Sequence, residues 1–463
     1  MKKPAFKKMI ALMLALLISC IPLGACSLGK PAGPLRILLD VSDRTMYSNT
    51  SYVFDKLLEE IAAEGGPADV EVEYLPRTGV ERETAITRLR TEIMAGDGPD
   101  LFIISSCYWW DGESPDDIPL FPMPEKSMYN GLFMPLDKYM EKAKFAQWGD
   151  FNQTVMEVGQ TDKGQVLVPL SYTFPVTCFR RTEANHEPSK DLTWDDMLAD
   201  GSLIMKAAAV LQGGSDENQI GGFGNPNFDA VFGKVADYKA EELLFTQEEF
   251  AEYAYKQLEL YKEESWAGLE QLPEYFHTYA RPWYYTYGDR MGGVPPYIRS
   301  GEDLTVIPQY NKDGGVTATV FHYACVNAGS KRGEDAFFVL DYLLGRGAVR
   351  ADVATAEGGS YTQAQADWRQ DFYSLFFGSN GVPIDQGVEY FNVHEGVISA
   401  HNRTALELAE HCITAVNIHG KLNKQMAWMM SQCETIQSGY EEGNIEALIA
   451  ETYRVMQMEL QEG

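Results

Sequence analysis

Short apolar strands alternate with amphipathic helices between residues 35 and 105, and this order restricts the fold more than any other feature of the chain. The expected elements are strand Leu35–Val41, helix Ser51–Ala63, strand Val70–Leu75, helix Glu81–Ala95 and strand Leu101–Ser105. A β–α–β–α–β order predicts a parallel sheet covered by helices on both faces, whose ligands bind at the carboxyl ends of the strands. The loops after Val41 and Ser105 are therefore the first candidate ligand sites.

The rest of the chain continues this mixture of strands and helices. Because 463 residues exceed what one hydrophobic core usually supports, we expect two domains, or two lobes that share the chain. Residues 111–130 are rich in Pro, Asp and Gly and are expected to form a loop. Later strands are expected at Val166–Pro169, Val176–Arg180, Leu304–Pro308 and Val316–Asn327, and the main later helices at Leu136–Lys144, Trp194–Ala199, Ala207–Gln212, Gln247–Glu264, Leu269–Tyr279, Gly333–Leu344 and Ile445–Leu460. The whole chain therefore belongs to the α/β class.

The first 25 residues have the organisation of a secretory signal peptide. Four lysines among the first eight residues precede the apolar run Met9–Ile18, which is too short to span a bilayer of roughly 30 Å. The segment ends in Leu23–Cys26, which resembles the lipobox of bacterial lipoproteins. In that class the peptide is cut before the cysteine, whose thiol then carries a diacylglycerol. The resemblance implies that residues 1–25 are the signal, that Cys26 is lipidated and that residues 26–34 are a tether. An ordinary signal with an incidental cysteine is the alternative.

The chain is strongly acidic, with 67 Asp and Glu residues against 38 Lys and Arg residues and a formal net charge of −29. Such a surface repels phosphate backbones, so we expect no nucleic-acid partner. No segment after Cys26 approaches 18 uninterrupted apolar residues, so the protein is expected on the extracytoplasmic face of the cell membrane, held by its lipid anchor. The later cysteines are expected to be mostly buried thiols, with Cys412 and Cys433 as the one pairing to check.

Six segments in order along the chain resemble motifs of one protein family. The most specific contains a helix end, a G-x-x-P-D turn and the following strand, and another opens with Thr193 in a helix-capping position. The segments are Met94–Ile104, Leu132–Tyr139, Gly164–Arg180, Thr193–Leu198, Ser330–Leu344 and Ile445–Leu460. Together they resemble the sugar-binding family 1 of extracellular solute-binding proteins, the maltose-binding-protein-like family of bacterial ABC transporters. The chain departs from the family pattern at Phe179–Arg181 and in residues 111–130.

The resemblance implies a two-lobed periplasmic-binding-protein-like (type II) α/β fold, with hinge strands that cross between the lobes and a ligand cleft between them. By that template, residues 35–172 and 300–332 form an amino-terminal lobe, and residues 173–299 and 333–463 form a carboxy-terminal lobe. Proteins of this family close around a solute and present it to an ABC permease. We therefore expect a monomer that binds a small molecule, a mono- or oligosaccharide, with no catalytic residues and no cofactor.

Aromatic and polar residues near the expected strand ends and crossings are the candidate ligand contacts. Sugars present apolar CH faces rimmed by hydroxyl groups, so they suit aromatic platforms with carboxylate and amide neighbours. One aromatic run follows the strand that ends at Ser105, and a second lies at residues 283–287. The candidate substrate-binding residues are Asp43, Arg44, Tyr108, Trp109, Trp110, Asp111, Tyr172, Thr173, Trp283, Tyr284 and Tyr285. Packing within a lobe is the alternative for the aromatic residues.

The sequence leaves other functions open. A lipid-anchored glycoside hydrolase would also be acidic and aromatic, and it needs only two carboxylates roughly 5–10 Å apart. A lipoprotein of the same fold could instead serve a sensor or another protein partner, and the solute could be a peptide, a polyamine or another cation. His394, His401 and His411 lie at near-helical intervals, but no HxxxH or HExxH motif occurs, so we expect no metal site.

Overall fold

A seven-stranded sheet runs through the computed structural model, which describes residues 33–40, 50–76, 79–105, 119–180, 186–209, 228–260, 262, 303–347, 382–383 and 400–462. The strand order is β12-β6-β11-β3-β1-β2, and β13 pairs with β11 outside this path. The strands are β1 (Leu35–Asp40), β2 (Val70–Tyr74), β3 (Leu101–Ser105), β6 (Leu167–Thr173), β11 (Val316–Val326), β12 (Val382–Pro383) and β13 (Ile413–Ile418). Buried aliphatic side chains of β1, β3, β6 and β11 make this sheet the centre of the hydrophobic core.

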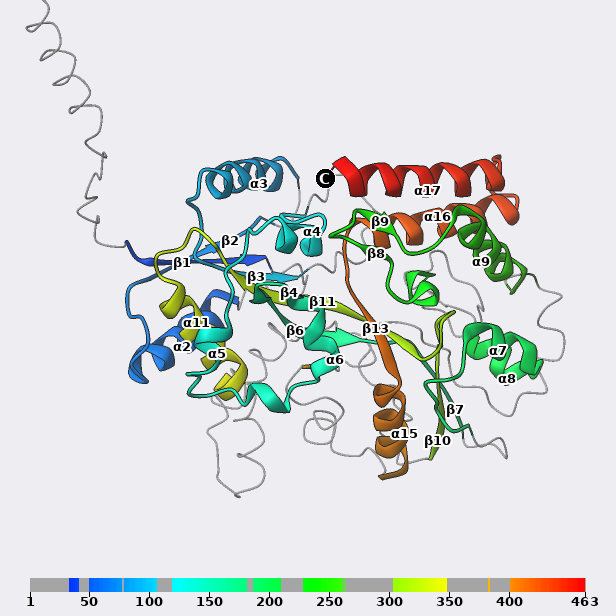
Figure 1. The fold of residues 1–463 in the computed structure, drawn as a ribbon, viewed down its shortest axis with the longest axis horizontal. Coiled ribbons are helices and arrows are strands. Elements are labelled where there is room, and N and C mark those ends of the chain that lie inside the picture. The colour runs from blue at the N-terminus through cyan, green and yellow to red at the C-terminus, as the bar shows by residue number, and fades with distance from the viewer. Residues whose placement is uncertain are drawn as a thin grey trace, which may run out of the picture.

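The first three strands have the arrangement that the sequence predicts. β1 pairs in parallel with β2 on one side and with β3 on the other. The connecting helices α2 (Thr50–Ala63) and α3 (Gly79–Met94) lie on opposite faces of the sheet (Figure 1). The complete sheet is mixed, however, because β11 runs antiparallel to both β3 and β6. A strand from a distant part of the chain enters the sheet in either direction, so the local β–α–β order does not determine the whole sheet.

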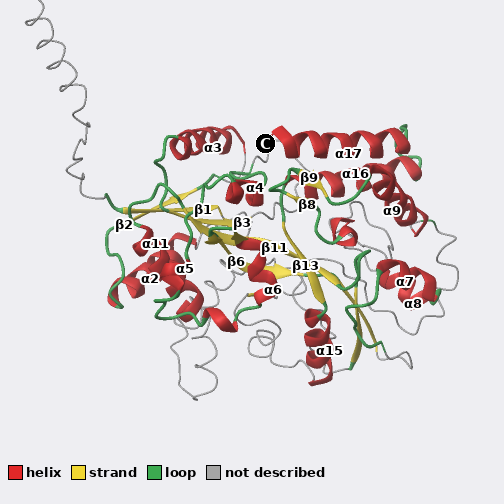
Figure 2. Ribbon diagram, in the orientation of Figure 1, coloured by secondary structure: helices red, strands yellow, loops and turns green. Residues whose placement is uncertain are grey.

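Helices and small antiparallel sheets make up the other half of the molecule (Figures 1 and 2). Two strand pairs, β7 with β10 and β8 with β9, lie there, and the helices α16 and α17 pack against each other and against α9. The elements of this half are β7 (Val176–Arg180), α7 (Trp194–Asp200), α8 (Leu203–Ala209), β8 (Ala236–Asp237), β9 (Glu242–Leu243), α9 (Gln247–Leu260), β10 (Leu304–Pro308), α15 (Ala400–His411), the strand β13 of the large sheet, α16 (Lys421–Gln437) and α17 (Ile445–Glu462).

The chain crosses between the halves along its strands. Phe174 and Pro175 separate β6 from β7, residues 309–315 separate β10 from β11, and β13 of the second half pairs with β11. α11 (Gly333–Tyr342) returns to the first half and packs on β1, β11 and α5 (Asp137–Met140), whereas β10 lies with β7 and α15. The lobe boundaries stay a prediction. By the template, α11 would lie in the carboxy-terminal lobe and β10 in the amino-terminal lobe, whereas α11 packs on the first half and β10 on the second. Long-range strand pairing and helix packing decide the place of both elements.

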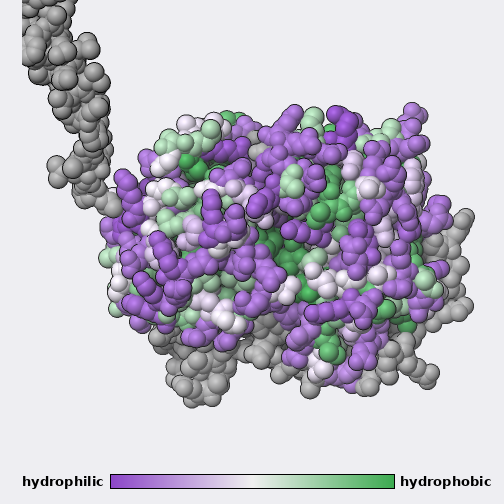
Figure 3. All heavy atoms as spheres, viewed as in Figure 1, coloured by the Kyte–Doolittle hydropathy of each residue, from purple (hydrophilic) through white to green (hydrophobic). Residues whose placement is uncertain are grey.

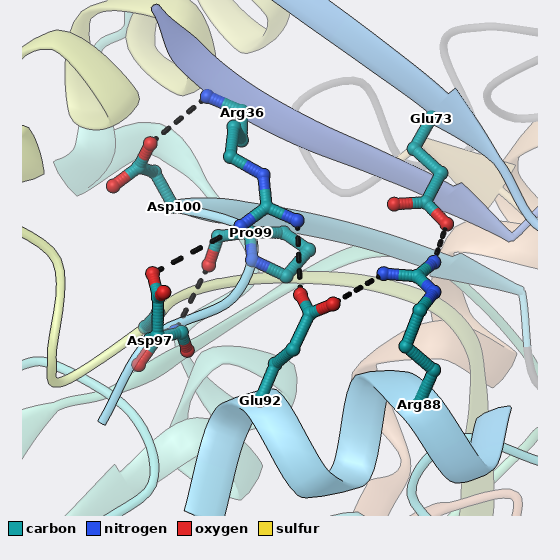
Figure 4. A network of polar contacts seen from close by, with 8 residues as sticks. Arg36, Glu73, Arg88, Glu92, Asp97, Pro99 and Asp100 are labelled. Atoms are coloured by element: carbon teal, nitrogen blue, oxygen red, sulfur yellow. Dashed lines mark hydrogen bonds and ion pairs between the residues drawn. The ribbon is translucent and has the colours of Figure 1, made fainter. Parts of the chain in front are cut away.

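The most specific family-like motif forms a turn that the protein itself saturates with hydrogen bonds (Figure 4). The Asp100 carboxylate accepts from the Arg36 amide at 2.9 Å and from the Ser330 hydroxyl at 2.6 Å. Asn327 Nδ2 donates to the carbonyls of Asp97 and Pro99, at 3.0 Å each. The turn lies at the amino end of β3, so its polar groups fix the entry of this strand into the sheet and lie away from the carboxyl edge.

Replacing Thr193 with alanine is expected to lower the free energy of unfolding by about 1 kcal/mol. Thr193 Oγ1 accepts from the Asp196 amide at 3.1 Å, and the Thr193 amide donates to the Asp196 carboxylate at 2.9 Å, which confirms the predicted cap of α7. Denaturant unfolding followed by circular dichroism measures the loss. Thr193→Ser keeps the hydroxyl and should stay within about 0.5 kcal/mol of the wild type. An equal loss in both variants would contradict the capping role.

Three cysteines of the described part of the chain are free thiols. Cys325, Cys412 and Cys433 are buried and free, so the suggested Cys412–Cys433 disulfide is not formed. Burial, helped by the nearby Glu434 carboxylate, raises the pKa of the Cys433 thiol to about 12, which keeps it protonated and unreactive. Within the same part of the chain, no helix combines the length and the apolar composition that crossing a bilayer requires.

Candidate ligand-binding site

The described residues include only a small part of the predicted binding set. Tyr172 lies at the end of β6, and Thr173 is its last residue. The other candidates lie outside the described residues, and so does Cys26: Asp43, Arg44, Tyr108, Trp109, Trp110, Asp111, Trp283, Tyr284 and Tyr285. Their contact with a solute stays a prediction, and the strand ends that precede them provide the geometry of the site.

The carboxyl ends of β1 and β3 lie side by side, as the sequence predicts. Asp40, the last residue of β1, is in register with Ile104, so β1 and β3 end at the same edge of the sheet. Ser105, the last residue of β3, is in register with His322 of β11, and His322 is in register with Ser171 of β6. The loops that follow β1 and β3 therefore start next to a row of polar residues that crosses three strands.

A buried serine–histidine pair forms part of this row. His322 Nδ1 lies 2.8 Å from Ser171 Oγ, and the two residues are 5% and 0% exposed. The imidazole and the hydroxyl belong to the groups that exchange hydrogen bonds with hydroxylated ligands. Sequence reasoning missed both residues, because one polar side chain within each apolar strand gives no local signal; only the pairing of β6 with β11 brings them together.

Tyr172 takes part in a polar cluster that connects the two halves of the molecule. Its hydroxyl donates to Glu410 Oε1 of α15, and Asn152 Nδ2 donates to the same oxygen at 3.2 Å. Asn152 also caps the short helix α6 (Gln153–Met156) through the amide of Val155. The tyrosine is fully buried. Its hydroxyl thus joins the end of β6 to α15 of the second half, near the chain crossing. A change in the relative position of the halves would alter this hydrogen bond.

A buried ion pair ends β1. Arg82 of α3 donates to both carboxylate oxygens of Asp40, at 2.9 Å each, and to the carbonyl of Pro76 at 2.9 Å. The two side chains are 1% and 2% exposed. Because the guanidinium forks onto the carboxylate, the charges neutralise each other. The ion pair therefore holds the end of β1 against α3, and Asp43 and Arg44 follow this end in the chain.

A cavity of about 410 Å³ lies on the other side of the sheet, between α4 (Pro124–Tyr129) and α17. Figure 1 places α4 and α17 above the sheet, whereas α6 and α15 of the Asn152–Glu410 cluster lie below it. The cavity is lined by positively charged lysines, negatively charged glutamates and two methionines, among them Lys126, Lys421, Glu459, Glu462, Met123 and Met458. The cavity thus lies on the opposite side of the sheet from the Asn152–Glu410 cluster.

Solved structures share this architecture over almost the whole chain, although no family model and no curated protein sequence matches it. A periplasmic oligogalacturonide-binding protein from Yersinia enterocolitica matches with a TM-score of 0.52 and 14% identity, over 93% of this chain and 99% of that one. An extracellular solute-binding protein of family 1 from Alicyclobacillus acidocaldarius matches with a TM-score of 0.50 and 12% identity, over 94% and 100%. The chain has the fold of the extracellular solute-binding proteins. The predicted two-lobed α/β fold and its resemblance to this group are confirmed.

The solute-binding fold also carries an engineered activity. A de novo designed cysteine esterase matches with a TM-score of 0.50 and 13% identity, over 93% of this chain and 98% of that one. A fold of this kind therefore does not by itself specify binding or catalysis, and the function depends on the residues of the site.

Proposed function

We propose that this chain is an extracytoplasmic solute-binding lipoprotein that captures a mono- or oligosaccharide and delivers it to an ABC-type permease. The observation that supports this function is the likeness to an oligogalacturonide-binding protein over 93% of the chain and 99% of that protein. Capture by cleft closure needs no bond to be made or broken. The difference in affinity between the open and closed states supplies the free energy, so the protein is not an enzyme.

Two acyl chains on Cys26 would hold the protein at the outer face of the cell membrane. The motif Leu23–Cys26 and the preceding apolar run are the basis of this assignment. One acyl chain binds a bilayer only marginally, whereas two anchor a protein stably. The tether of residues 26–34 would let the binding fold reach its permease while it remains attached.

The solute is proposed to lie over the carboxyl edge of the sheet. Tyr108, Trp109 and Trp110 follow β3 and would stack on the apolar faces of the sugar rings, and Trp283–Tyr285 would contribute from the second half. Asp43, Arg44 and Asp111 would bind the hydroxyl groups. The nearby Ser171–His322 pair supports a polar floor for this site, since its two groups lie next to the end of β3.

A saccharide at a hundred times its dissociation constant is expected to stabilise the protein by about 2.7 kcal/mol, because it binds only the folded state. A thermal-shift screen with neutral mono- and oligosaccharides and with galacturonides measures this, with amino acids, peptides and polyamines as comparison ligands. The shift should be lost in Trp109→Ala or Trp110→Ala and kept in Trp428→Ala, which removes an exposed tryptophan of α16. Chromatography of the incubated saccharide tests for turnover.

Three results would contradict the proposal in different ways. A shift with a polyamine or a peptide, and with no sugar, would replace the solute. Product formation would favour the glycoside hydrolase. The absence of a thermal shift with every ligand would favour a protein partner over a transported solute.

A further inference from the structure

One short segment of the first half is bonded to three elements of the second half. The segment is residues 122–126, at the start of α4, and it is anchored to the sheet by Phe121, whose ring packs edge-on against Phe102 of β3 at 5.3 Å. The Pro122 carbonyl accepts from the Lys421 amide of α16 at 2.9 Å, and Glu125 Oε1 accepts from the Ile418 amide of β13 at 3.0 Å. We call these contacts, with those of Lys126 to α17 and Glu241, the α4 seam. Hydrophobic side chains gather in the middle of the face drawn in Figure 3, where the halves meet.

Lys126 supplies the strongest polar contacts of the α4 seam. Its ammonium donates to the Leu460 carbonyl of α17 at 2.6 Å and pairs with Glu241 at 2.9 Å, while the residue is only 5% exposed. Glu241 has φ 57°, a left-handed conformation that is uncommon for a residue other than glycine, and no other non-glycine residue of the described part has a positive φ. Because the Lys126 ammonium binds these two partners, it forms no ion pair with the neighbouring Glu125.

Glu125 is a buried carboxyl group for which the described part of the chain shows no ion pair. The residue is 5% exposed; its Oε1 accepts from the Ile418 amide, and its Oε2 has no hydrogen-bond partner among the described residues. One backbone N–H does not compensate a carboxylate for its lost hydration. A neutral, protonated carboxyl group keeps the bond from Ile418 and buries no charge. The geometry therefore favours a proton on Glu125 as long as the seam is intact.

Burial raises the pKa of Glu125, whereas the Ile418 amide and the Lys234 charge lower it by less. Asp229, a second buried carboxyl, accepts from Asn423 Nδ2 at 2.6 Å, and burial, followed by the nearby Glu125 and Asp229 carboxylates, raises the pKa of the Tyr238 phenol. Tyr129 and Lys234 also lie close enough to interact with Glu125, Glu241 pairs with Lys126, and His419, which follows Ile418 in the chain, lies near Lys424. Burial, and then the Lys424 charge, lower the pKa of His419 to about 3, so this imidazole is neutral and supplies no counter-charge. Burial raises the pKa of Glu125 to about 7 and that of Asp229 to about 6.

We propose that the α4 seam is a proton-operated latch between the two halves, closed while Glu125 carries its proton and loosened when Glu125 is ionised. An ionised Glu125 would draw water into the seam or part α4 from β13, since either change hydrates the charge. The sign follows from linkage. A carboxyl group whose pKa is raised by folding stabilises the closed seam fully below its ordinary pKa near 4.5, and this stabilisation is lost as the pH rises through about 7.

Hydrogen exchange of the solute-free protein, measured by mass spectrometry between pH 5 and pH 8, tests the latch. Protection of residues 413–420 and 454–462, corrected for the intrinsic exchange rate, should fall by more than about tenfold from pH 5 to pH 7 and then level off. Strands β1 and β3 should change much less. In Glu125→Gln the amide oxygen still accepts from Ile418 and no charge can form, so seam protection should stay near its value at pH 5 throughout.

Matched variants keep the test decisive. Glu242→Gln removes an exposed carboxylate of β9 close to the seam and should behave as the wild type does. Asp229→Asn leaves Glu125 free to titrate, so most of the pH dependence should remain, and this variant answers the question even if Glu125→Gln folds poorly. The latch would be overturned if protection of the wild-type seam did not change with pH, or if it changed as much in Glu125→Gln as in the wild type. No solute is present, so neither result bears on saccharide capture.

Discussion

Replacing Arg82 with methionine is expected to lower the free energy of unfolding by about 3–5 kcal/mol. The variant leaves the Asp40 carboxylate, 2% exposed, without the guanidinium that donates to both of its oxygens, and it also removes the bond to the Pro76 carbonyl. Methionine fills much of the space of the arginine stem, so the loss reports the missing guanidinium charge more than a cavity. Guanidinium unfolding at pH 7, followed by circular dichroism and by tryptophan fluorescence, measures the difference.

The same substitution on the same helix provides the control. Arg88 of α3 is 43% exposed and pairs with Glu92 and Glu73 in the surface network of Figure 4. Arg88→Met should cost less than about 1 kcal/mol, because exposed ion pairs contribute little. The double variant Asp40→Leu, Arg82→Met removes both buried charges and should recover most of the loss. Equal effects at Arg82 and Arg88, or no recovery in the double variant, would contradict the assignment.

Local patterns predicted the elements that local forces build. The apolar runs and helical spacings between residues 35 and 105 became β1, α2, β2, α3 and β3, with their ends displaced by at most a few residues. Thr193 caps α7 as expected, since a capping box involves only residues three positions apart. The fold that the family resemblance implies is also confirmed by the solved structures.

The family-like motifs do not identify the ligand, for a physical reason. Asp100 accepts hydrogen bonds from Ser330 and from the Arg36 amide of β1, at the amino end of β3. The groups next to the carboxyl edge, such as Ser171 and His322, come together from positions 151 residues apart in the chain. Strand pairing at that separation leaves no trace in a short window of sequence. The fold was therefore more predictable than the site.

Long-range packing also decided features that the periodicity left open. The antiparallel entry of β11 made the sheet mixed, and α11 joined the first half through its contacts with β1 and α5. Nothing in the segment around Glu125 distinguishes its buried carboxyl from the other acids of so acidic a chain. Its role in the α4 seam depends on Ile418, which follows it by 293 positions.

The loss of the Asp341 carboxylate is expected to lower the free energy of unfolding by about 3–5 kcal/mol in Asp341→Ala. Asp341 of α11 is 3% exposed, and its oxygens accept from three successive amides, those of residues 144–146, at 2.7, 3.2 and 2.9 Å. Alanine would leave three N–H groups without their acceptor, and the one of Ala146 is buried away from water. Gly345 packs its backbone against the same segment, where a Cβ atom would lie 2.1 Å from the Phe145 carbonyl carbon. The segment is thus too tightly held to turn its amides outward.

Asp335→Ala, on the same helix, separates this effect from a general loss of helix charge. Asp335 lies in the first turn of α11, is 42% exposed and pairs with Arg332, so its removal should cost less than about 1 kcal/mol. Asp341→Asn keeps one acceptor oxygen but turns an amide donor toward the remaining N–H groups, and it should fall between the alanine variant and the wild type. In denaturant unfolding, the loss of free energy of unfolding should be largest for Asp341→Ala, smaller for Asp341→Asn and smallest for Asp335→Ala, because the three variants remove progressively fewer buried acceptors. If the two alanine variants lose the same amount, the amides of residues 144–146 find water, and α11 is held to the first half by apolar packing alone.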